Sequence, residues 1–351
     1  MGTHASGPSY VKNATTTSTL KAHLNDQDLP FLFKVLSVRT ALSIQAHPDL
    51  SLAQKLHASD PKNYRDGNHK PEMAIALGGE FEALCGFRRA KDIYTFAKMY
   101  DGFGKLIGEE AVEKLNVVNC ENSEREAIKF AFEKLMKSKV DDIIESISLM
   151  PEACDSSDPV ISLFHRLHQQ YPNDIGIFCV FFLNHFTLQA GEAVFLAANE
   201  PHAYLSGSCI ECMATSDNVV RAGLTPKHRD VDVLCSMLTY NSFNGLDEIL
   251  TKPQKMSADR PNAYLYKSPV PEFSVLRIEL RDHETDACIY ESAKYIGRSI
   301  IICTEGSAVL SSNEVSFNLE FGSIVYLPAH CEFVIESSSN STVIYQAFEP
   351  K

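Results

Sequence analysis

The chain has 351 residues, of which 44% are hydrophobic and 22% charged, and its formal net charge is −13 at pH 7. This composition is typical of a globular protein of two or three structural units, and it argues against a general nucleic-acid-binding role because a phosphate backbone attracts a basic surface. No apolar run is long enough to cross a bilayer and the N-terminal residues lack the apolar core of a signal peptide, so we expect a cytoplasmic protein without a membrane partner.

The first part of the chain has the patterns of a β-rich unit. Residues 1–28 are polar and rich in Thr, Ser and Asn, which predicts loop with a short helix. Residues 30–87 alternate apolar and polar side chains as strands do, and one helical pattern at 50–57 interrupts them.

The middle of the chain changes character and then returns to strands. Residues 90–171 carry apolar residues at spacings of three and four, which predicts amphipathic helices at 91–96, 124–140 and 160–170. Most of residues 175–213 has strand patterns, with a turn at 189–192. Residues 230–250 are expected to be helical in part, and short alternating strands recur from 270 to 348.

Two β-rich blocks therefore flank a helical insert, and we predict a mainly β fold. A jelly-roll (cupin-like) barrel is one architecture that would bring distant strand residues to a common metal in its mouth. The predicted divisions are 1–89 and 173–255 for one β-rich unit with the metal site, 90–172 for the helical insert, and 256–351 for a second, C-terminal β-rich unit.

Three short segments hold the parts of one metal site. The alternation across residues 42–47 puts Gln45 and His47 on one face of a predicted strand, two residues apart. Glu72 shares the less bulky face of the next strand pattern, and His202 follows the strand pattern at 192–198. Two imidazoles, one carboxylate and one amide oxygen suit Zn²⁺ in a catalytic role, with positions left open for water or substrate, better than a closed thiolate site would.

Spacing alone also allows an interpretation in which these residues bind no metal. The chain has 12 histidines, and a histidine beside a proline is a loop residue more often than a metal ligand. Cys209 and Cys212 also form a C-x-x-C pair among the ten cysteines, most of which we expect to be buried free thiols of a reducing compartment. The strand pattern at 208–214 would put these two thiols on opposite faces, so we expect no shared ion there.

Five segments in this order resemble type I phosphomannose isomerases, a family of zinc enzymes; they are residues 29–38, 42–48, 68–76, 84–88 and 201–227. The resemblance implies two cupin-type barrels with a helical domain and one zinc per chain. It carries the metal ligands onto Gln45, His47, Glu72 and His202, and a catalytic arginine onto Arg221. It also implies interconversion of mannose 6-phosphate and fructose 6-phosphate through an enediol-type proton transfer, feeding GDP-mannose synthesis.

The resemblance has one departure at the N-terminus. Family chains carry several dozen residues ahead of the segment that matches residues 1–8, including a YxWG-like element, whereas this sequence contains no Trp. We therefore expect a chain that lacks the family's first strands. A catalytically impaired truncated form or a non-enzymatic sugar-phosphate-binding cupin is accordingly the alternative to an active isomerase.

The isomerisation needs an electrophile, a base within reach of the carbon acid and a phosphate clamp. Arg221 suits charge stabilisation, and a salt bridge to Asp217 or Glu211 is its structural alternative. Sequence does not decide which of Glu211, Lys227 and Asp217 is the base; we take Glu211 and Lys227 as catalytic candidates.

The remaining candidates concern the substrate and the partners. Ser43, Lys70, Tyr204 and Asp217 are predicted to contact the substrate, because each shares a face or a loop with a predicted ligand or with Arg221. The expected partner is a small phosphorylated sugar, without nucleic acid, and the chain is expected to be a monomer. A cupin oxygenase needs a redox metal and usually two or three histidines, and a Gln and a Glu beside two His make it the poorer hypothesis.

Overall fold

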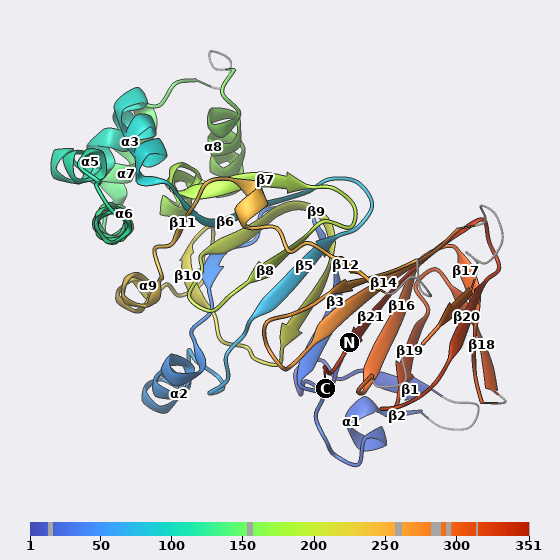
Figure 1. Cartoon of the computed structure of the whole chain (residues 1–351). Helices are drawn as coiled ribbons and strands as arrows, with labels where there is room; N and C mark the ends of the chain where they lie inside the picture. Colours follow the sequence, from blue (N-terminus) through green and yellow to red (C-terminus); the bar gives the residue numbers. More distant parts are fainter. Residues whose placement is uncertain are drawn as a thin grey trace.

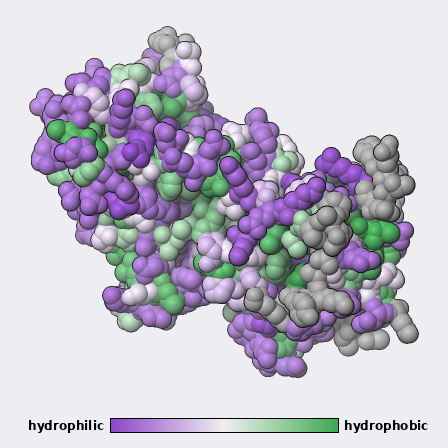
Figure 2. Space-filling view, in the orientation of Figure 1, coloured by the Kyte–Doolittle hydropathy of each residue, from purple (hydrophilic) through white to green (hydrophobic). Residues whose placement is uncertain are grey.

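The computed structural model describes residues 1–12, 17–152, 157–256, 262–281, 289–292, 296–313 and 315–350. Figure 1 shows the helices between β6 and β7 gathered at one end of the molecule and the C-terminal strands at the other, with the central sheet between them. In Figure 2, hydrophilic side chains cover most of the helical end, and apolar side chains are scattered over this face. No helix in the described part of the chain is long and apolar enough to span a bilayer.

The central unit is a nine-stranded sheet built from two separate parts of the chain. Its strands are β3 (Phe31–Val38), β4 (Ile44–Ala46), β5 (Glu72–Ala76), β6 (Phe81–Arg88), β7 (Leu183–Leu188), β8 (Ala193–Leu196), β9 (His202–Ala214), β10 (Val220–Gly223) and β11 (Ser242–Phe243). The long strand β9 pairs with β3, β4, β5 and β6. Strands from either side of the helical insert therefore meet on β9.

Two short helices and an N-terminal hairpin accompany this sheet. Helix α2 (Leu50–Ser59) begins at Asp49 and α9 (Val231–Met237) begins at Asp230; in each, the aspartate side chain accepts a backbone N–H of the first turn. The N-terminal segment forms β1 (Tyr10–Lys12), β2 (Thr17–Thr19) and α1 (Leu20–His23). The prediction of loop with a short helix missed the hairpin, because three-residue strands are too short to show a period.

The helical insert contains α3 (Ala90–Met99), α4 (Asp101–Ile107), α5 (Glu109–Asn116), α6 (Glu121–Met136), α7 (Val140–Ser148) and α8 (Pro159–Gln170). Its three predicted helices correspond to α3, α6 and α8. The segment η2 (Ile175–Phe181), predicted as strand, is a 3₁₀ helix whose seven residues are all buried. A run that is apolar at every position has neither helical nor strand periodicity, which explains the error.

The C-terminal unit stacks two sheets on a shared apolar core. One sheet has the order β12 (Gln254–Lys255), β13 (Ala263–Tyr266), β14 (Ser274–Arg281), β21 (Ser341–Phe348), β16 (Ser299–Glu305), β19 (Ile324–Leu327). The other has the order β15 (Ile289–Glu291), β20 (Val334–Ser337), β17 (Ser307–Ser312), β18 (Val315–Glu320). The 3₁₀ turn η3 (Leu246–Glu248) precedes this unit.

The fold class is confirmed as mainly β with a helical insert and two cupin-like β units. A second core cluster joins the two β units: Met73 and Ile75 of β5 and Ile210 of β9 pack with Tyr266 and Phe273 of the C-terminal unit. The exact divisions after residues 89, 172 and 255 stay predictions.

Candidate metal centre

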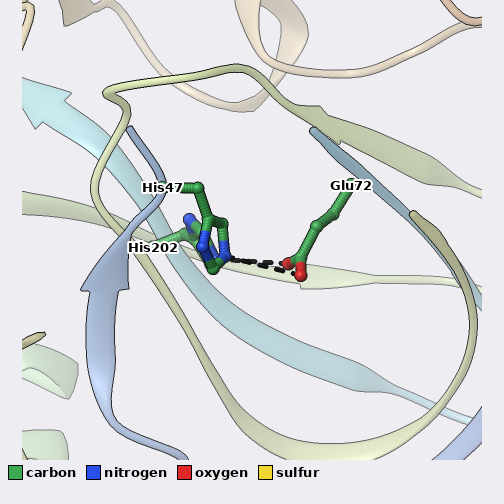
Figure 3. Close-up of side chains that lie close together, drawn as sticks. All are labelled: His47, Glu72 and His202. Atoms are coloured by element: carbon green, nitrogen blue, oxygen red, sulfur yellow. Dashed lines mark ion pairs between the residues drawn. The ribbon is translucent and has the colours of Figure 1, made fainter. Parts of the chain in front are cut away.

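His47, Glu72 and His202 converge inside the central sheet, although they come from three remote segments (Figure 3). One ligand atom of each lies within 4.8 Å of the others. The Nε2 atom of His47 lies 3.4 Å from Oε1 of Glu72, and Nε2 of His202 lies 3.5 Å from Oε2. Among the described residues this is the one group of three or more His, Cys, Asp or Glu side chains with such spacing.

Hydrogen bonds orient both imidazoles toward the carboxylate. The Nδ1 atom of His47 lies 2.7 Å from the carbonyl oxygen of Asn218, and Nδ1 of His202 lies 3.1 Å from that of Glu200. Because a carbonyl only accepts, each Nδ1 carries the proton and each Nε2 presents a lone pair to the centre of the cluster.

Burial and charge give the cluster the properties of a cation site. All three side chains are buried, and His47 Nε2 and Glu72 Oε2 have no hydrogen-bond partner within the described residues. Burial lowers the pKa of His47 to about 4, so the imidazole is neutral at pH 7. Burial would raise the pKa of Glu72, but Lys70 and then His47 hold it well below its usual value. Unpartnered buried lone pairs beside a carboxylate fit a divalent ion.

Gln45 lies beside this cluster, opposite His202 in the ladder between β4 and β9. Its Nε2 atom is 3.5 Å from His202 Nε2, while its Oε1 accepts a hydrogen bond from Ser43 Oγ at 3.3 Å. A half-turn of the amide would present the oxygen to the cluster instead. Strand β4 is shorter than predicted, so Ser43 and His47 flank it rather than lie in it; Pro48, after His47, prevents the strand from continuing.

Strand β4 lies between β9 and β10, and Arg221 of β10 pairs directly with Gln45 of β4. Directly paired residues share a face of the sheet, so Arg221 and Gln45 lie on the same face. Arg221 lines a small pocket of about 30 Å³ with Tyr64 and Asp230. The predicted alternative, a salt bridge to Asp217 or Glu211, is not what the structure shows. Asp217 approaches His4 at 3.5 Å, and Glu211 pairs with a lysine instead.

That lysine is Lys34 of β3, which inspection of the sequence missed. Its Nζ lies 2.7 Å from Glu211 Oε2 and donates to Met213 Sδ at 2.9 Å. Burial opposes the charge of Lys34, but Glu211 and then Glu72 raise its pKa above the usual value. Register places Met213 opposite Glu72, so the ion pair and the metal cluster face the same interior.

The other predicted site residues form two groups, one buried near the metal cluster and one at the surface. Lys70 is buried with Nζ 3.2 Å from Glu72 Oε1, and Tyr204 is buried with its ring 6.2 Å from that of His202. Burial, and then the carboxylates of Glu211 and Glu72, raise the pKa of Tyr204 well above its usual value. Lys227 is exposed in the loop after β10, and Asp217 turns away toward His4.

A cavity and a pair of cysteines lie apart from the metal cluster. A cavity of about 600 Å³ lies between the N-terminal hairpin and the C-terminal unit, but its lining is mainly apolar and distant in sequence from the cluster. Cys209 and Cys212 belong to different core clusters, as the strand pattern predicted, so they do not share an ion.

Comparison with known proteins places this site in a family. Two family models match the chain: "Phosphomannose isomerase type I, catalytic domain" over residues 1–90 and "Phosphomannose isomerase type I, helical insertion domain" over residues 106–183. The mannose-6-phosphate isomerase of Rattus norvegicus is 43% identical over 335 residues, covering 92% of this chain and 75% of the relative. The Homo sapiens enzyme of the same name is 39% identical, covering 100% and 86%.

Solved structures agree with these relatives. A phosphomannose isomerase variant from Salmonella typhimurium superposes with a TM-score of 0.86 at 27% identity, covering 99% of this chain and 89% of that one. A mannose 6-phosphate isomerase bound with zinc and yttrium gives a TM-score of 0.81 at 27% identity, covering 100% and 90%.

Proposed function

The chain belongs to the type I phosphomannose isomerase family, and on that premise we propose that it interconverts mannose 6-phosphate and fructose 6-phosphate with one bound zinc ion. The observation that carries the proposal is the buried cluster of His47, Glu72 and His202, whose ligand atoms converge while two of them lack a hydrogen-bond partner among the described residues. The reaction would supply mannose 6-phosphate for GDP-mannose synthesis.

The proposed zinc ligands are His47, Glu72, His202 and, after a half-turn of its amide, Gln45. When bound, zinc would polarise the sugar oxygens as a Lewis acid. One carboxylate among three neutral ligands leaves net positive charge at the site, which suits an anionic sugar phosphate. Lys70, 3.2 Å from Glu72, adds a cation on the same side.

Proton transfer between C1 and C2 through an enediol requires a base near the sugar. Of the three bases left open by sequence, Glu211 is the one buried in the interior that Glu72 also faces. We assign it the proton transfer, with Lys34 as the partner that fixes the orientation of its carboxylate. Lys227 and Asp217 lie at the surface, so their roles would require substrate at the mouth of the site.

Arg221 is proposed to stabilise negative charge on the substrate. It faces the same side of the sheet as Gln45, its direct partner in the ladder between β10 and β4. A guanidinium forks two hydrogen bonds to phosphate or to adjacent sugar oxygens. Lys227, six residues further along and exposed, would supply a cation for the phosphate.

A coupled assay of fructose 6-phosphate formation tests the proposal, together with elemental analysis for zinc. We expect turnover that chelation abolishes and added zinc restores. Arg221→Ala should lower kcat/KM by about 10²–10³-fold with zinc content retained, because a charge-stabilising donor is lost. The matched control is Arg39→Ala, which removes an exposed guanidinium from another loop and should leave kcat/KM unchanged.

Two outcomes would contradict this function. Wild-type kcat/KM in Arg221→Ala would remove the arginine from the mechanism. Binding of zinc and mannose 6-phosphate without any turnover would favour the alternative, a catalytically impaired or purely sugar-phosphate-binding cupin.

A further inference from the structure

Asp66 joins two segments that are about 150 residues apart, the loop that leads to Glu72 and residues 216–218. Its carboxylate accepts hydrogen bonds from Asn68 N at 2.9 Å and Ser216 Oγ at 2.8 Å. It also accepts from Asp217 N at 2.7 Å and from the side-chain amide of Asn218 at 3.3 Å. Four donors on one half-buried carboxylate tie the loop before β5 to the loop before β10.

Asn218 is the other half of this arrangement. It is completely buried, and its side-chain amide also donates to the carbonyl oxygens of Asp66 at 2.6 Å and Asn68 at 2.9 Å. Its own carbonyl receives Nδ1–H of His47 at 2.7 Å. The position of the oxygen that orients His47 is therefore fixed by contacts to residues 66 and 68.

The two histidines of the cluster differ in how they are oriented. His202 donates to Glu200, a residue of its own segment two positions earlier, so this contact forms locally. His47 donates to a carbonyl 171 positions away, and only the meeting of two loops brings that oxygen into place. His47 is therefore the ligand that depends on a separate positioning residue.

We propose that Asp66 is a positioning residue which, through Asn218, holds His47 in the Nδ1–H tautomer with Nε2 directed at the zinc site. The inference rests on the proposed zinc site and adds a residue that does not touch the ion. Outer partners of this kind set the tautomer and ring orientation of a ligand, and their loss typically costs about 10–100-fold in metal affinity.

The substitution Asp66→Asn addresses this role at nearly constant size. It replaces one acceptor oxygen by an NH₂ group, and either orientation of the new amide points that NH₂ at an existing donor. On one side the donor is Asp217 N–H, and on the other Ser216 Oγ and the Asn218 amide. Either orientation therefore removes at least one of the hydrogen bonds that hold residues 216–218, and with them the Asn218 carbonyl, against Asp66.

The experiment measures the zinc dissociation constant of the full chain by competition with a chelator. We expect Asp66→Asn to weaken zinc binding by about 10–100-fold. The matched control is Asp60→Asn in the preceding turn, where a partly exposed aspartate accepts hydrogen bonds from nearby Asn63; zinc affinity should be unchanged. Equal zinc affinity in wild type and Asp66→Asn would overturn the inference.

A second readout separates positioning from mere stability. Nitrogen-15 NMR of the zinc-free protein should show His47 as the Nδ1–H tautomer in wild type and as a mixture in Asp66→Asn. A purely structural role would lower the melting temperature without changing the tautomer or the zinc affinity, and that result would also overturn the inference. Failure of wild type to bind zinc would instead contradict the proposed function.

Ser216→Ala tests the same set of hydrogen bonds between Asp66 and residues 216–218 if Asp66→Asn does not fold. The Ser216 hydroxyl donates to Asp66 and accepts the backbone N–H of Asn218 at 3.1 Å, so its removal loosens the contact without adding a donor. We expect zinc binding to weaken by about threefold to tenfold. Unchanged zinc affinity in Ser216→Ala would contradict the role assigned to Asp66.

Discussion

Lys34 occupies a position that its local sequence gives no reason to single out. It lies in β3 between Phe33 and Val35, as one polar residue of an alternating strand. Register with β9 places it opposite Glu211, where its ammonium closes a 2.7 Å ion pair inside the sheet. A carboxylate taken out of water is stable there because the lysine accompanies it.

Variants of this pair should separate activity from stability. Glu211→Gln should lower kcat by about 10²–10⁴-fold if the carboxylate moves the proton. Lys34→Met should lower the free energy of unfolding by about 2–3 kcal/mol, because it leaves Glu211 buried and unpaired. The double variant should recover most of that stability but no turnover.

The measurements are denaturant unfolding and the coupled assay. Lys21→Met is the matched control, since Lys21 pairs with Asp28 at 2.9 Å on the exposed surface, where a pair contributes at most about 1 kcal/mol. Full activity in Glu211→Gln would exclude the carboxylate as the base.

Strand β9 carries a bulge that lets both ends of the strand serve one site. Its ladder with β6 shifts register between Glu82 and Ala83, so β9 has one extra residue there. His202 and Tyr204 therefore face the same interior as Cys209 and Glu211, although even and odd positions of a regular strand point to opposite faces. Gly207, with φ +97°, follows Ser206, the residue of β9 that pairs with Glu82.

Gly207→Ala should lower the free energy of unfolding by at least about 2 kcal/mol. A side chain is strained at this φ, and its Cβ would overlap the carbonyl oxygen of Glu80. Denaturant unfolding measures the change. Gly78→Ala is the control, because Gly78 has open space around it and should change stability by less than about 0.5 kcal/mol. Equal stability of the two variants would refute the requirement for glycine at position 207.

Across the molecule as a whole, one carboxylate ties the helical insert to the central sheet. Glu82 of β6 accepts hydrogen bonds from Arg166 of α8, from His185 of β7 and from Ser206 of β9. Burial would raise its pKa, but His185 and then Arg166 lower it to about 2. This contact fixes the last helix of the insert against β6, β7 and β9, and β9 carries His202.

Glu82→Gln should lower the free energy of unfolding at pH 7 by about 1–2 kcal/mol, a modest value because solvent screens part of the interaction. A carboxyl whose folded pKa is depressed stabilises the fold above its unfolded pKa, near 4.5, and this contribution is lost as pH falls toward about 2. The stability difference between wild type and variant should therefore shrink over that window.

Denaturant unfolding at a series of pH values measures this dependence. Glu80→Gln, at an exposed position two residues earlier, should show neither the loss at pH 7 nor the pH dependence. A difference that stays constant from pH 7 to pH 3 would contradict the role of the ionised carboxylate.

Residue patterns alone predicted the order of the β-rich blocks and the helical insert, and they singled out the candidate ligands without showing that these meet. Periodicity separated strands from helices, since it reports which face of an element is buried. Gln45 and His47 stood out because they share one face of a predicted strand, and Glu72 and His202 because they lie at two further strand patterns; the resemblance to a zinc family selected the same four. The structure brings the three imidazole and carboxylate side chains together and places Gln45 beside them.

By contrast, only the tertiary structure shows which residues that are remote in sequence face one another. Periodicity predicts the buried face of each strand, but the register between β3 and β9 depends on contacts 177 residues apart, so Lys34 remained hidden. Asp66 was equally invisible, because its role exists only where two loops meet. The bulge in β9 also depends on its pairing with β6, since an extra residue in one strand is defined only against its partner.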